Sequence, residues 1–272
     1  MVYNIPAGPG AVDFDGDGFL DTAYVGDTGG NMWRFKFCLR GDDTTASPCA
    51  CTSSSCPKWS GGLLFSKPST TLSIFTSASV AFDPSQNLWV YFGTGDKANP
   101  TSTTTQDRFY AIQDSKDGSR STTYQLSDLT DITSLSQYDV TSGKHGWYIN
   151  LQGTGEKLLA APVVYDKKVY FTTYTPSVTP CDQNGIAKLY VVDYVTAKGE
   201  CAGGARSVNV GTGVPSGAVI SVNPYGGYDT YISTSSPILE TVGSAHTFKE
   251  TDPSTVFQKS KNIIYWRDNR VQ

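Results

Sequence analysis

Residues 88–94 read Leu-Trp-Val-Tyr-Phe-Gly-Thr, and after a loop residues 108–114 read Arg-Phe-Tyr-Ala-Ile-Gln-Asp. The pattern returns about 80 residues later, as Lys-Val-Tyr-Phe-Thr-Thr at 168–173 and Lys-Leu-Tyr-Val-Val-Asp at 188–193. Both copies consist of two runs rich in β-branched and aromatic residues, which is typical of strands. A repeated strand, turn and strand unit punctuated by glycine and aromatic residues is typical of the blades of a β-propeller.

Shorter features extend the repeat in both directions. Each copy follows another apolar run, Ser-Val-Ala-Phe at 79–82 and Ala-Pro-Val-Val at 161–164, and a degenerate third copy reads Ala-Tyr-Val-Gly-Asp-Thr-Gly-Gly-Asn-Met-Trp-Arg-Phe at 23–35. The alternative architecture is a β-sandwich, whose strands need not resemble one another. The repeat therefore favours a propeller.

Strand patterns dominate the chain, and apolar spacing of three and four is almost absent, so we expect an all-β fold. The strand candidates, about fifteen in all, include Thr22–Val25, Asn31–Phe37, Ser73–Phe82, Leu88–Gly93, Arg108–Gln113, Lys157–Tyr165, Lys168–Tyr174, Ala187–Tyr194 and Asn262–Trp266. Helical spacing is confined to Leu126–Leu135, where we expect irregular structure. At about four strands per blade this number of strands makes roughly four blades.

Few propellers close with four blades, so we expect the chain to be the later half of a longer, modified β-propeller with long loop insertions. No linker interrupts residues 1–272, which we treat as one domain or a fragment of one. We expect the insertions near 38–62, 96–107 and 114–146, and the first of these is a cysteine-rich surface segment.

Composition restricts the partners. The chain has 272 residues, with 21 Lys and Arg against 25 Asp and Glu, and its formal net charge of -4 does not favour nucleic acid. Hydrophobic residues make up 38% and aromatic residues 12%, which is enough apolar surface for a folded core. No apolar run reaches the roughly 18 to 20 residues that a transmembrane helix needs.

The cysteines favour an exported protein. Cys38, Cys49, Cys51 and Cys56 lie in one Ser-, Thr- and Pro-rich stretch, while Cys181 and Cys201 flank a predicted strand. We predict a Cys181–Cys201 disulfide and two bridges among the first four cysteines. A direct Cys49–Cys51 bridge would be strained, so two pairings of these four stay open. Zinc binding by the four is less favoured because paired C-x2-C units are absent. The chain does not start with a secretion signal, so export would require a signal outside this sequence.

Enzyme motifs are scarce. We find no nucleophile elbow, phosphate loop or dinucleotide-binding glycine pattern, and predict that the chain is not an enzyme. The tripeptide Arg40-Gly41-Asp42 lies at the entrance of the cysteine-rich insertion. On an exposed loop it could dock to an integrin-type receptor, although a chance match of three residues is common.

One motif carries a definite chemistry: Asp-Phe-Asp-Gly-Asp-Gly-Phe-Leu-Asp at 13–21. Alternating carboxylates suit a hard cation that takes six to eight oxygen ligands, and Gly18 lets the loop curl. Without an ion, four carboxylates would repel one another within nine residues. The motif predicts a Ca²⁺ site. Its ligands, by the spacing of an EF-hand loop, are Asp13, Asp15, Asp17, the carbonyl of Phe19, and Asp21.

The twelfth position, which supplies a bidentate Glu in an EF-hand, is Tyr24 here. We therefore expect Asp21 to close the shell and to link the loop to the strand beginning at Thr22. The loss of one ligand group predicts an affinity in the micromolar to millimolar range, which suits an extracellular module.

These motifs together resemble the PilY family of type IV pilus biogenesis factors and tip adhesins. The Asp-rich loop followed directly by Tyr-Val-Gly-Asp-Thr-Gly-Gly-Asn-Met-Trp-Arg-Phe at 24–35 is similar to the hallmark of that family. The likeness continues through Val-Tyr-Phe-Gly-Thr-Gly at 90–95 and Gly-Trp-Tyr-Ile-Asn-Leu at 146–151 to Tyr-Trp-Arg-Asp at 265–268. It covers nearly the whole chain, but the cysteine-rich insertion departs from the pattern.

The resemblance implies a seven-bladed modified propeller at the C-terminal end of a larger exported protein, with the missing blades supplied by the upstream chain. It also implies a place at the pilus tip or outer cell surface, where such proteins help to prime pilus assembly, oppose retraction when calcium is bound, and contribute to adhesion and twitching motility. Minor pilins, other tip components and host or surface receptors are the partners implied. The family's calcium ligands correspond to Asp13, Asp15, Asp17, Phe19 and Asp21.

The leading hypothesis is thus a non-enzymatic, calcium-binding module for pilus assembly and adhesion. One alternative is a propeller lectin that stacks exposed Trp and Tyr on sugars. Another is a quinoprotein-type oxidoreductase, whose blades share the Trp-Arg-Phe pattern at 33–35. We set it aside because we recognise neither a vicinal disulfide nor repeated tryptophan-docking motifs.

Overall fold

The computed structural model describes residues 2–14, 16, 18, 20–37, 59–68, 72–114, 121–179, 184–222, 227–237 and 245–249. These residues form β-strands and two short 3-10 helices, with no α-helix among them, so the all-β prediction is confirmed. The strands are β1 (Gly10–Val12), β2 (Thr22–Gly26), β3 (Met32–Phe37), β4 (Trp59–Phe65), β5 (Ser79–Phe82), β6 (Leu88–Gly93), β7 (Arg108–Gln113), β8 (Thr130–Asp131), β9 (Gly146–Asn150), β10 (Lys157–Leu158), β11 (Val163–Tyr165), β12 (Lys168–Thr175), β13 (Ile186–Asp193), β14 (Ser207–Thr212), β15 (Val219–Val222), β16 (Tyr228–Thr234), β17 (Ser236–Pro237) and β18 (Ala245–Lys249). The 3-10 helices are η1 (Leu126–Asp128) and η2 (Ala202–Gly204).

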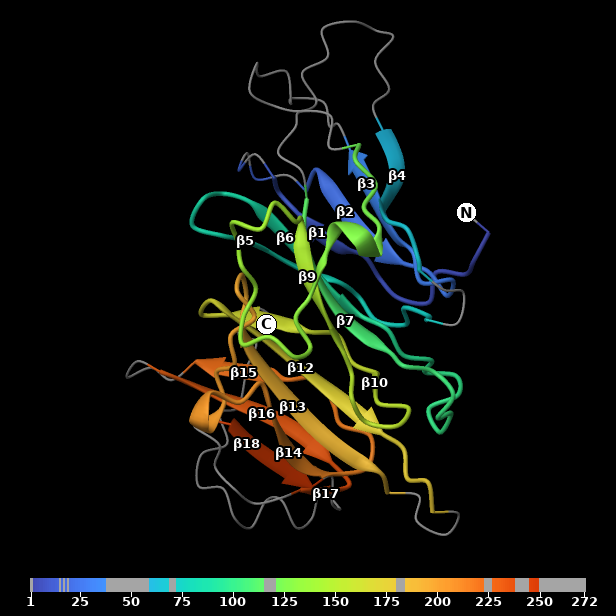
Figure 1. The fold of residues 1–272 in the computed structure, drawn as a ribbon, viewed down its shortest axis with the longest axis vertical. Helices are drawn as coiled ribbons and strands as arrows, with labels where there is room; N and C mark the ends of the chain where they lie inside the picture. The colour runs from blue at the N-terminus through green and yellow to red at the C-terminus, as the bar shows by residue number, and fades with distance from the viewer. Residues whose placement is uncertain are drawn as a thin grey trace, which may run out of the picture.

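The strands assemble into four sheets that follow one another along the chain, except that β17 of the third sheet lies between β16 and β18 of the fourth. The first sheet has the order β1-β2-β3-β4, the second β5-β6-β7-β9-β8, the third β10-β12-β13-β14-β17 with β11 also on β12, and the fourth β15-β16-β18. Figure 1 shows the blue first sheet in the upper half of the view, the second sheet below it, and the third and fourth sheets together in the lower half. Strand β5 of the second sheet lies against β1 of the first sheet and against β11 of the third. The third and fourth sheets meet where β14 lies against β16 and β17 against β18. Four sheets packed against one another in this way are the blades of a β-propeller, as predicted.

The sequence repeat corresponds to equivalent strands of two sheets. β5, β6 and β7 pair in antiparallel order in the second sheet, and β11, β12 and β13 do so in the third. The degenerate copy supplies β2 and β3 of the first sheet, which pair from Thr22 with Lys36 to Gly26 with Met32. The internal repeat therefore marks the blades.

Strand alternation explains why the central strands read as continuous apolar runs. In β6 the side chains of Trp89 and Tyr91 belong to the core between the second and third sheets. Those of Val90 and Phe92 belong to the core between the first and second sheets. All residues of β6 are buried because neighbouring blades cover both of its faces.

Aromatic rings join the second and third sheets. Phe109 on β7 stacks on Phe171 on β12 with ring centroids 3.8 Å apart, and Phe171 stacks in turn on Tyr190 of β13 at 4.6 Å. Aromatic pairs add about 0.5–1.5 kcal/mol beyond the burial of the rings in the preferred geometries with centroids about 4.5–7 Å apart, a range that the Phe171–Tyr190 pair meets. No ladder joins one described sheet to the next, so side-chain packing carries much of the contact between these blades. Single backbone bonds add to it, such as that from the Leu158 N–H to the Thr94 carbonyl at 3.0 Å.

Two predicted strands are shorter than expected. Of Ser73–Phe82 only the last four residues form a strand, β5, and Lys157–Tyr165 is divided into β10 and β11. The break between β10 and β11 contains Pro162, which lacks the N–H that a ladder requires. Leu126–Leu135 contains η1 and β8 and no longer helix, and Asn262–Trp266 lies outside the described residues.

Most of the predicted 38–62 insertion, up to residue 58, lies outside the described residues. Residues 59–62 belong to β4, which pairs with β3 from Trp59 opposite Phe37 onwards. In the described part of the chain no helix is long and apolar enough to cross a membrane.

Candidate calcium loop and buried polar centres

The Asp-rich loop connects β1 to β2, the first two strands of the first sheet. Val12 pairs with Thr22 at its base, and the Asp21 N–H donates to the Val12 carbonyl at 3.1 Å. The carbonyl of Asp21 accepts the Phe37 N–H of β3 at 2.7 Å. Both ends of the loop are thus fixed by backbone hydrogen bonds, and its last residue contacts two neighbouring strands.

The beginning of the loop curls around the Asp13 carboxylate. Oδ1 accepts the Gly16 N–H at 2.7 Å and Oδ2 accepts the Gly18 N–H at 2.8 Å. The two glycines have φ of +80° and +93°, the left-handed region that favours glycine. Gly18 is the sixth residue of the loop, the position at which an EF-hand loop has its glycine.

The end of the loop is fixed by Asp21, which is 4% exposed. Its Oδ2 accepts the Phe14 N–H at 2.7 Å, and its Oδ1 accepts the Thr22 hydroxyl at 2.6 Å. The structure therefore places Asp13 and Asp21 at the two ends of one curled loop. Their hard oxygen donors and the position of Gly18 fit calcium.

The other predicted ligands, Asp15, Asp17 and Phe19, lie outside the described residues. Within the described residues no three His, Cys, Asp or Glu side chains gather as a metal site would require. The ligand set as a whole therefore stays a prediction.

A hairpin motif that the sequence analysis missed occurs between β2 and β3. The Asp27 Oδ1 accepts the N–H groups of Gly29 and Asn31, both at 2.9 Å. Its Oδ2 accepts the Asn31 side-chain amide and the Trp33 indole N–H, both at 2.8 Å. One buried carboxylate thus closes the turn and fixes the first tryptophan of the next strand.

The same arrangement recurs between β5 and β6. Asp83 accepts the N–H groups of Ser85 at 2.8 Å and Asn87 at 2.9 Å, the Asn87 amide at 2.6 Å and the Trp89 indole at 3.1 Å. Burial works to raise the pKa of Asp83, but the hydrogen bonds from Asn87, Trp89 and Ser85 outweigh it and hold that pKa below its ordinary value.

The sequence signal for this motif is the spacing Asp-x-x-x-Asn-x-Trp, which occurs at 27–33 and again at 83–89. In each of these two hairpins the aspartate accepts the indole N–H of a tryptophan. The role visible here is structural, since all four contacts of each carboxylate lie within one turn.

A buried ion pair connects the first and second sheets. Arg34 Nη1 on β3 pairs with Asp114 Oδ1 just after β7, and the side chains are 3% and 0% exposed. The Tyr24 hydroxyl donates to Asp114 Oδ2 at 2.6 Å. Removing one member of such a pair leaves an uncompensated buried charge, so this contact couples the two blades strongly.

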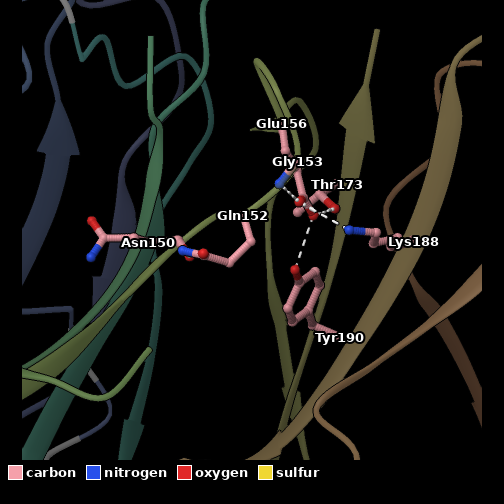
Figure 2. A network of polar contacts seen from close by, with 7 residues as sticks. All are labelled: Asn150, Gln152, Gly153, Glu156, Thr173, Lys188 and Tyr190. Carbon is pink, nitrogen blue, oxygen red and sulfur yellow. Dashed lines mark hydrogen bonds and ion pairs between the residues drawn. The ribbon is translucent and has the colours of Figure 1, made fainter. Parts of the chain in front are cut away.

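A second polar centre surrounds Glu156, which is fully buried beside the third sheet. Its Oε1 accepts the hydroxyls of Thr173 at 2.7 Å and Tyr190 at 2.9 Å, and its Oε2 accepts the Gly153 N–H at 2.7 Å and the Lys188 ammonium at 3.0 Å. Figure 2 shows these donors converging from the loop, β12 and β13 on one carboxylate.

The surroundings of this centre lower the pKa of Glu156 and raise the pKa of Tyr190. Burial works to raise the pKa of Glu156, but the bonds from Thr173 and Gly153 and the charge of Lys188 hold it below its ordinary value. Burial and the neighbouring Glu156 charge raise the pKa of Tyr190. Glu156 is therefore an ionised acceptor and Tyr190 a neutral donor at neutral pH.

The adjacent Lys157 is fully buried as well. Its ammonium donates to the carbonyls of Pro100 at 3.1 Å, Ser102 at 2.6 Å and Gly155 at 2.7 Å. Burial lowers the pKa of Lys157. This lysine fixes the long β6–β7 loop to the beginning of the third sheet.

The structure does not confirm the predicted cysteine pairing. Cys201 is a free, buried thiol whose pKa is raised by burial. Cys181 and the cluster at 38–56 lie outside the described residues, as does Arg40-Gly41-Asp42. The predicted Cys181–Cys201 bridge is therefore contradicted, because Cys201 is a free thiol. The two bridges predicted among Cys38, Cys49, Cys51 and Cys56 and the adhesive tripeptide stay predictions.

Comparison with known proteins identifies the family of this fold. The family model described as the PilY1 beta-propeller domain matches residues 2–139, which is more than half of the chain. The chain belongs to the PilY1 β-propeller family. The matched span contains the whole first sheet, the Asp-rich loop and both Asp-Asn-Trp hairpins.

Relatives of the PilY1 family agree with this assignment. The chain is 30% identical over 220 residues to a protein named type IV pilus biogenesis factor PilY1 homolog from Xylella fastidiosa strain Temecula1. The match covers 71% of this chain and 14% of that relative. The crystal structure of the Pseudomonas aeruginosa PilY1 C-terminal domain superposes with a TM-score of 0.58 at 19% identity, covering 82% of this chain and 58% of that domain. This similarity supports the propeller fold.

Proposed function

We propose that this chain is a non-enzymatic, calcium-binding propeller module of a type IV pilus biogenesis factor, acting in pilus assembly and adhesion at the pilus tip or outer cell surface. The observation that carries the proposal is the curled loop 13–21 inside the segment that matches the PilY1 family. The relative from Xylella fastidiosa, named as a pilus biogenesis factor, supports the pilus role.

In this proposal the side chains of Asp13 and Asp21, with Asp15, Asp17 and the carbonyl of Phe19, hold one Ca²⁺. The ion would supply positive charge that offsets the repulsion among four carboxylates. Asp21 acts as the pivot, because its backbone already bonds to β1 and β3 while its carboxylate bonds to the loop. Order in the loop is thereby coupled to the edge of the first blade.

We also propose that further blades come from the upstream polypeptide. The chain spans 58% of the solved PilY1 domain, so that domain has room for additional blades. In the fourth sheet, Val219 and Val222 of β15 are 61% and 60% exposed, whereas the central strand β6 is wholly buried. Minor pilins and other tip components are the proposed partners of the completed propeller, and host or surface receptors are proposed for adhesion.

The test replaces Asp21 by Ala in the full-length protein of a bacterium that makes type IV pili. We expect fewer surface pili and a smaller twitching zone, and loss of the response of the wild type to a calcium chelator. The matched control is Asp139→Ala, which removes a fully exposed aspartate in a surface turn. Pilus number and twitching equal to those of the wild type in the Asp21 variant would rule out the calcium loop as the functional element.

A further inference from the structure

A pocket of about 410 Å³ opens between the second and third sheets, on the side of β9 and β13. Its volume lies in the range of small-molecule sites. The lining includes Leu135, Ser136, Gln152, Tyr190, Lys198 and Arg206. Figure 2 shows Gln152 and Tyr190 from the two sides of this junction, close to the Glu156 centre.

The walls of the pocket are rigid because their polar groups bond to the chain itself. Arg206 donates from Nε to the Ala197 carbonyl at 2.9 Å, from Nη1 to Ile132 at 2.8 Å and from Nη2 to Leu135 at 2.5 Å. Tyr190 is 6% exposed, with its hydroxyl on Glu156. The guanidinium therefore ties the loop of the second sheet to the third sheet and contributes a fixed positive charge.

Asn150, at the end of β9, forms a second wall of the pocket. The Asn150 Oδ1 accepts a hydrogen bond from the Arg108 Nε at 2.7 Å, and the Asn150 Nδ2 donates to Asp131 at 2.9 Å. Both ends of this amide are therefore engaged within the chain. The carboxylate of Asp131 is occupied by this bond and by the Thr133 hydroxyl at 2.5 Å. These neutral donors hold the carboxylate in place, and Asp131 is not among the residues that line the pocket.

Three lining groups keep hydrogen-bonding capacity for a ligand. The described residues provide no partner for the Lys198 ammonium or the Ser136 hydroxyl, and Lys198 is exposed. Gln152 uses its amide N–H on the Asn150 carbonyl at 3.1 Å, which leaves its side-chain oxygen as an acceptor. The pocket thus presents one cation, one hydroxyl and one amide oxygen next to the apolar side chain of Leu135, which is 48% exposed.

We propose that this pocket binds an acidic saccharide, a pyranose ring carrying a carboxylate such as a hexuronic acid. The carboxylate would pair with Lys198, reinforced by the fixed charge of Arg206. Ring hydroxyls, which both donate and accept, match Gln152 and Ser136, and the C–H face of the ring matches Leu135. This site is separate from loop 13–21 and does not depend on the calcium proposal.

Calorimetric titration of a hyaluronan tetrasaccharide into the chain, in the presence of EDTA, tests the assignment. We expect saturable binding that Lys198→Gln weakens by about tenfold or more, while cellotetraose, a neutral tetrasaccharide, binds far more weakly. The matched control is Lys97→Gln, which removes an exposed lysine outside the pocket and should not change the affinity.

Three results would overturn the proposal: no binding of the acidic saccharide by the wild type, equal binding of cellotetraose, or an affinity unaffected by Lys198→Gln. Tetraglutamate that binds as tightly and with the same dependence on Lys198 would assign the pocket to acidic peptides instead. Equal melting temperatures of the two lysine variants and the wild type establish that any loss is local.

Discussion

Replacement of Glu156 by Ala tests how strongly one buried carboxylate holds the third sheet. The substitution leaves the hydroxyls of Thr173 and Tyr190 and the Gly153 N–H without their acceptor. A buried donor left unpaired costs about 1–3 kcal/mol. The Lys188 side chain is 24% exposed, so hydration offsets much of its loss. These losses do not simply add, because the groups share one centre. We expect the free energy of unfolding to fall by about 3–5 kcal/mol.

The assay is equilibrium denaturation in urea at pH 7, with the free energy of unfolding extrapolated to water. Glu200→Ala is the matched control. Glu200 also pairs with a lysine, Lys168 at 3.7 Å, but the two side chains are 32% and 30% exposed. Such a surface pair contributes at most about 1 kcal/mol.

We expect a clear difference in the free energy of unfolding between the two glutamate variants. A loss below about 1 kcal/mol for Glu156→Ala, or a loss equal to that of Glu200→Ala, would refute the claim that the buried centre stabilises the blade. An unchanged dependence on urea concentration in both variants shows that the same surface is exposed on unfolding.

Three further perturbations have expected outcomes. The pKa of Glu156 in the folded protein is lowered from its ordinary value of 4.5. The ionised carboxylate therefore stabilises the fold above pH 4.5, and this stabilisation is lost as the pH falls through the folded-state pKa. Urea denaturation across the acid range should therefore show a steeper loss of stability in the wild type than in Glu156→Gln, and parallel curves would contradict this. Asp114→Ala should cost about 3–5 kcal/mol, and the double variant Arg34→Met, Asp114→Leu should recover most of it; no recovery would mean that the charges themselves are needed. Trp89→Phe, which removes the indole donor to Asp83, should lower the free energy of unfolding by about 1–2 kcal/mol, and an unchanged value would exclude a stabilising role for that hydrogen bond.

The blades were largely predictable because the central strand of a blade is buried on both faces and is therefore apolar along its whole length. Leu88–Gly93 is apolar at every position since it is covered on both faces, and its predicted bounds are those of β6. β15 was not singled out, because Val219–Val222 is largely exposed and its alternation is weak. Lys157–Tyr165 was predicted as one strand because its residues are mostly apolar. The structure divides it into β10 and β11, and Pro162 between them has no N–H to donate to a ladder.

The candidate loop was predictable for a different reason. Its spacing is local, so Asp13 and Asp21 could be assigned from the sequence to one loop that leads into the strand at Thr22. The short strand β1 (Gly10–Val12) before the loop was not among the strands named from the sequence. The Glu156 centre was not predictable in this way. Its lysine partner is 32 residues away along the chain and meets it only when β13 pairs with β12. The same holds for Arg34 and Asp114, which are 80 residues apart and come from different sheets.

Calorimetric titration of Ca²⁺ into the chelator-treated chain tests the central claim most directly. The account predicts one ion per chain with a Kd in the micromolar to millimolar range, and loss of binding in Asp21→Ala. Calcium at about 100 times Kd should then raise the free energy of unfolding of the wild type by about 2.7 kcal/mol. Absence of binding heat in the wild type, or an identical titration in Asp21→Ala, would contradict the account.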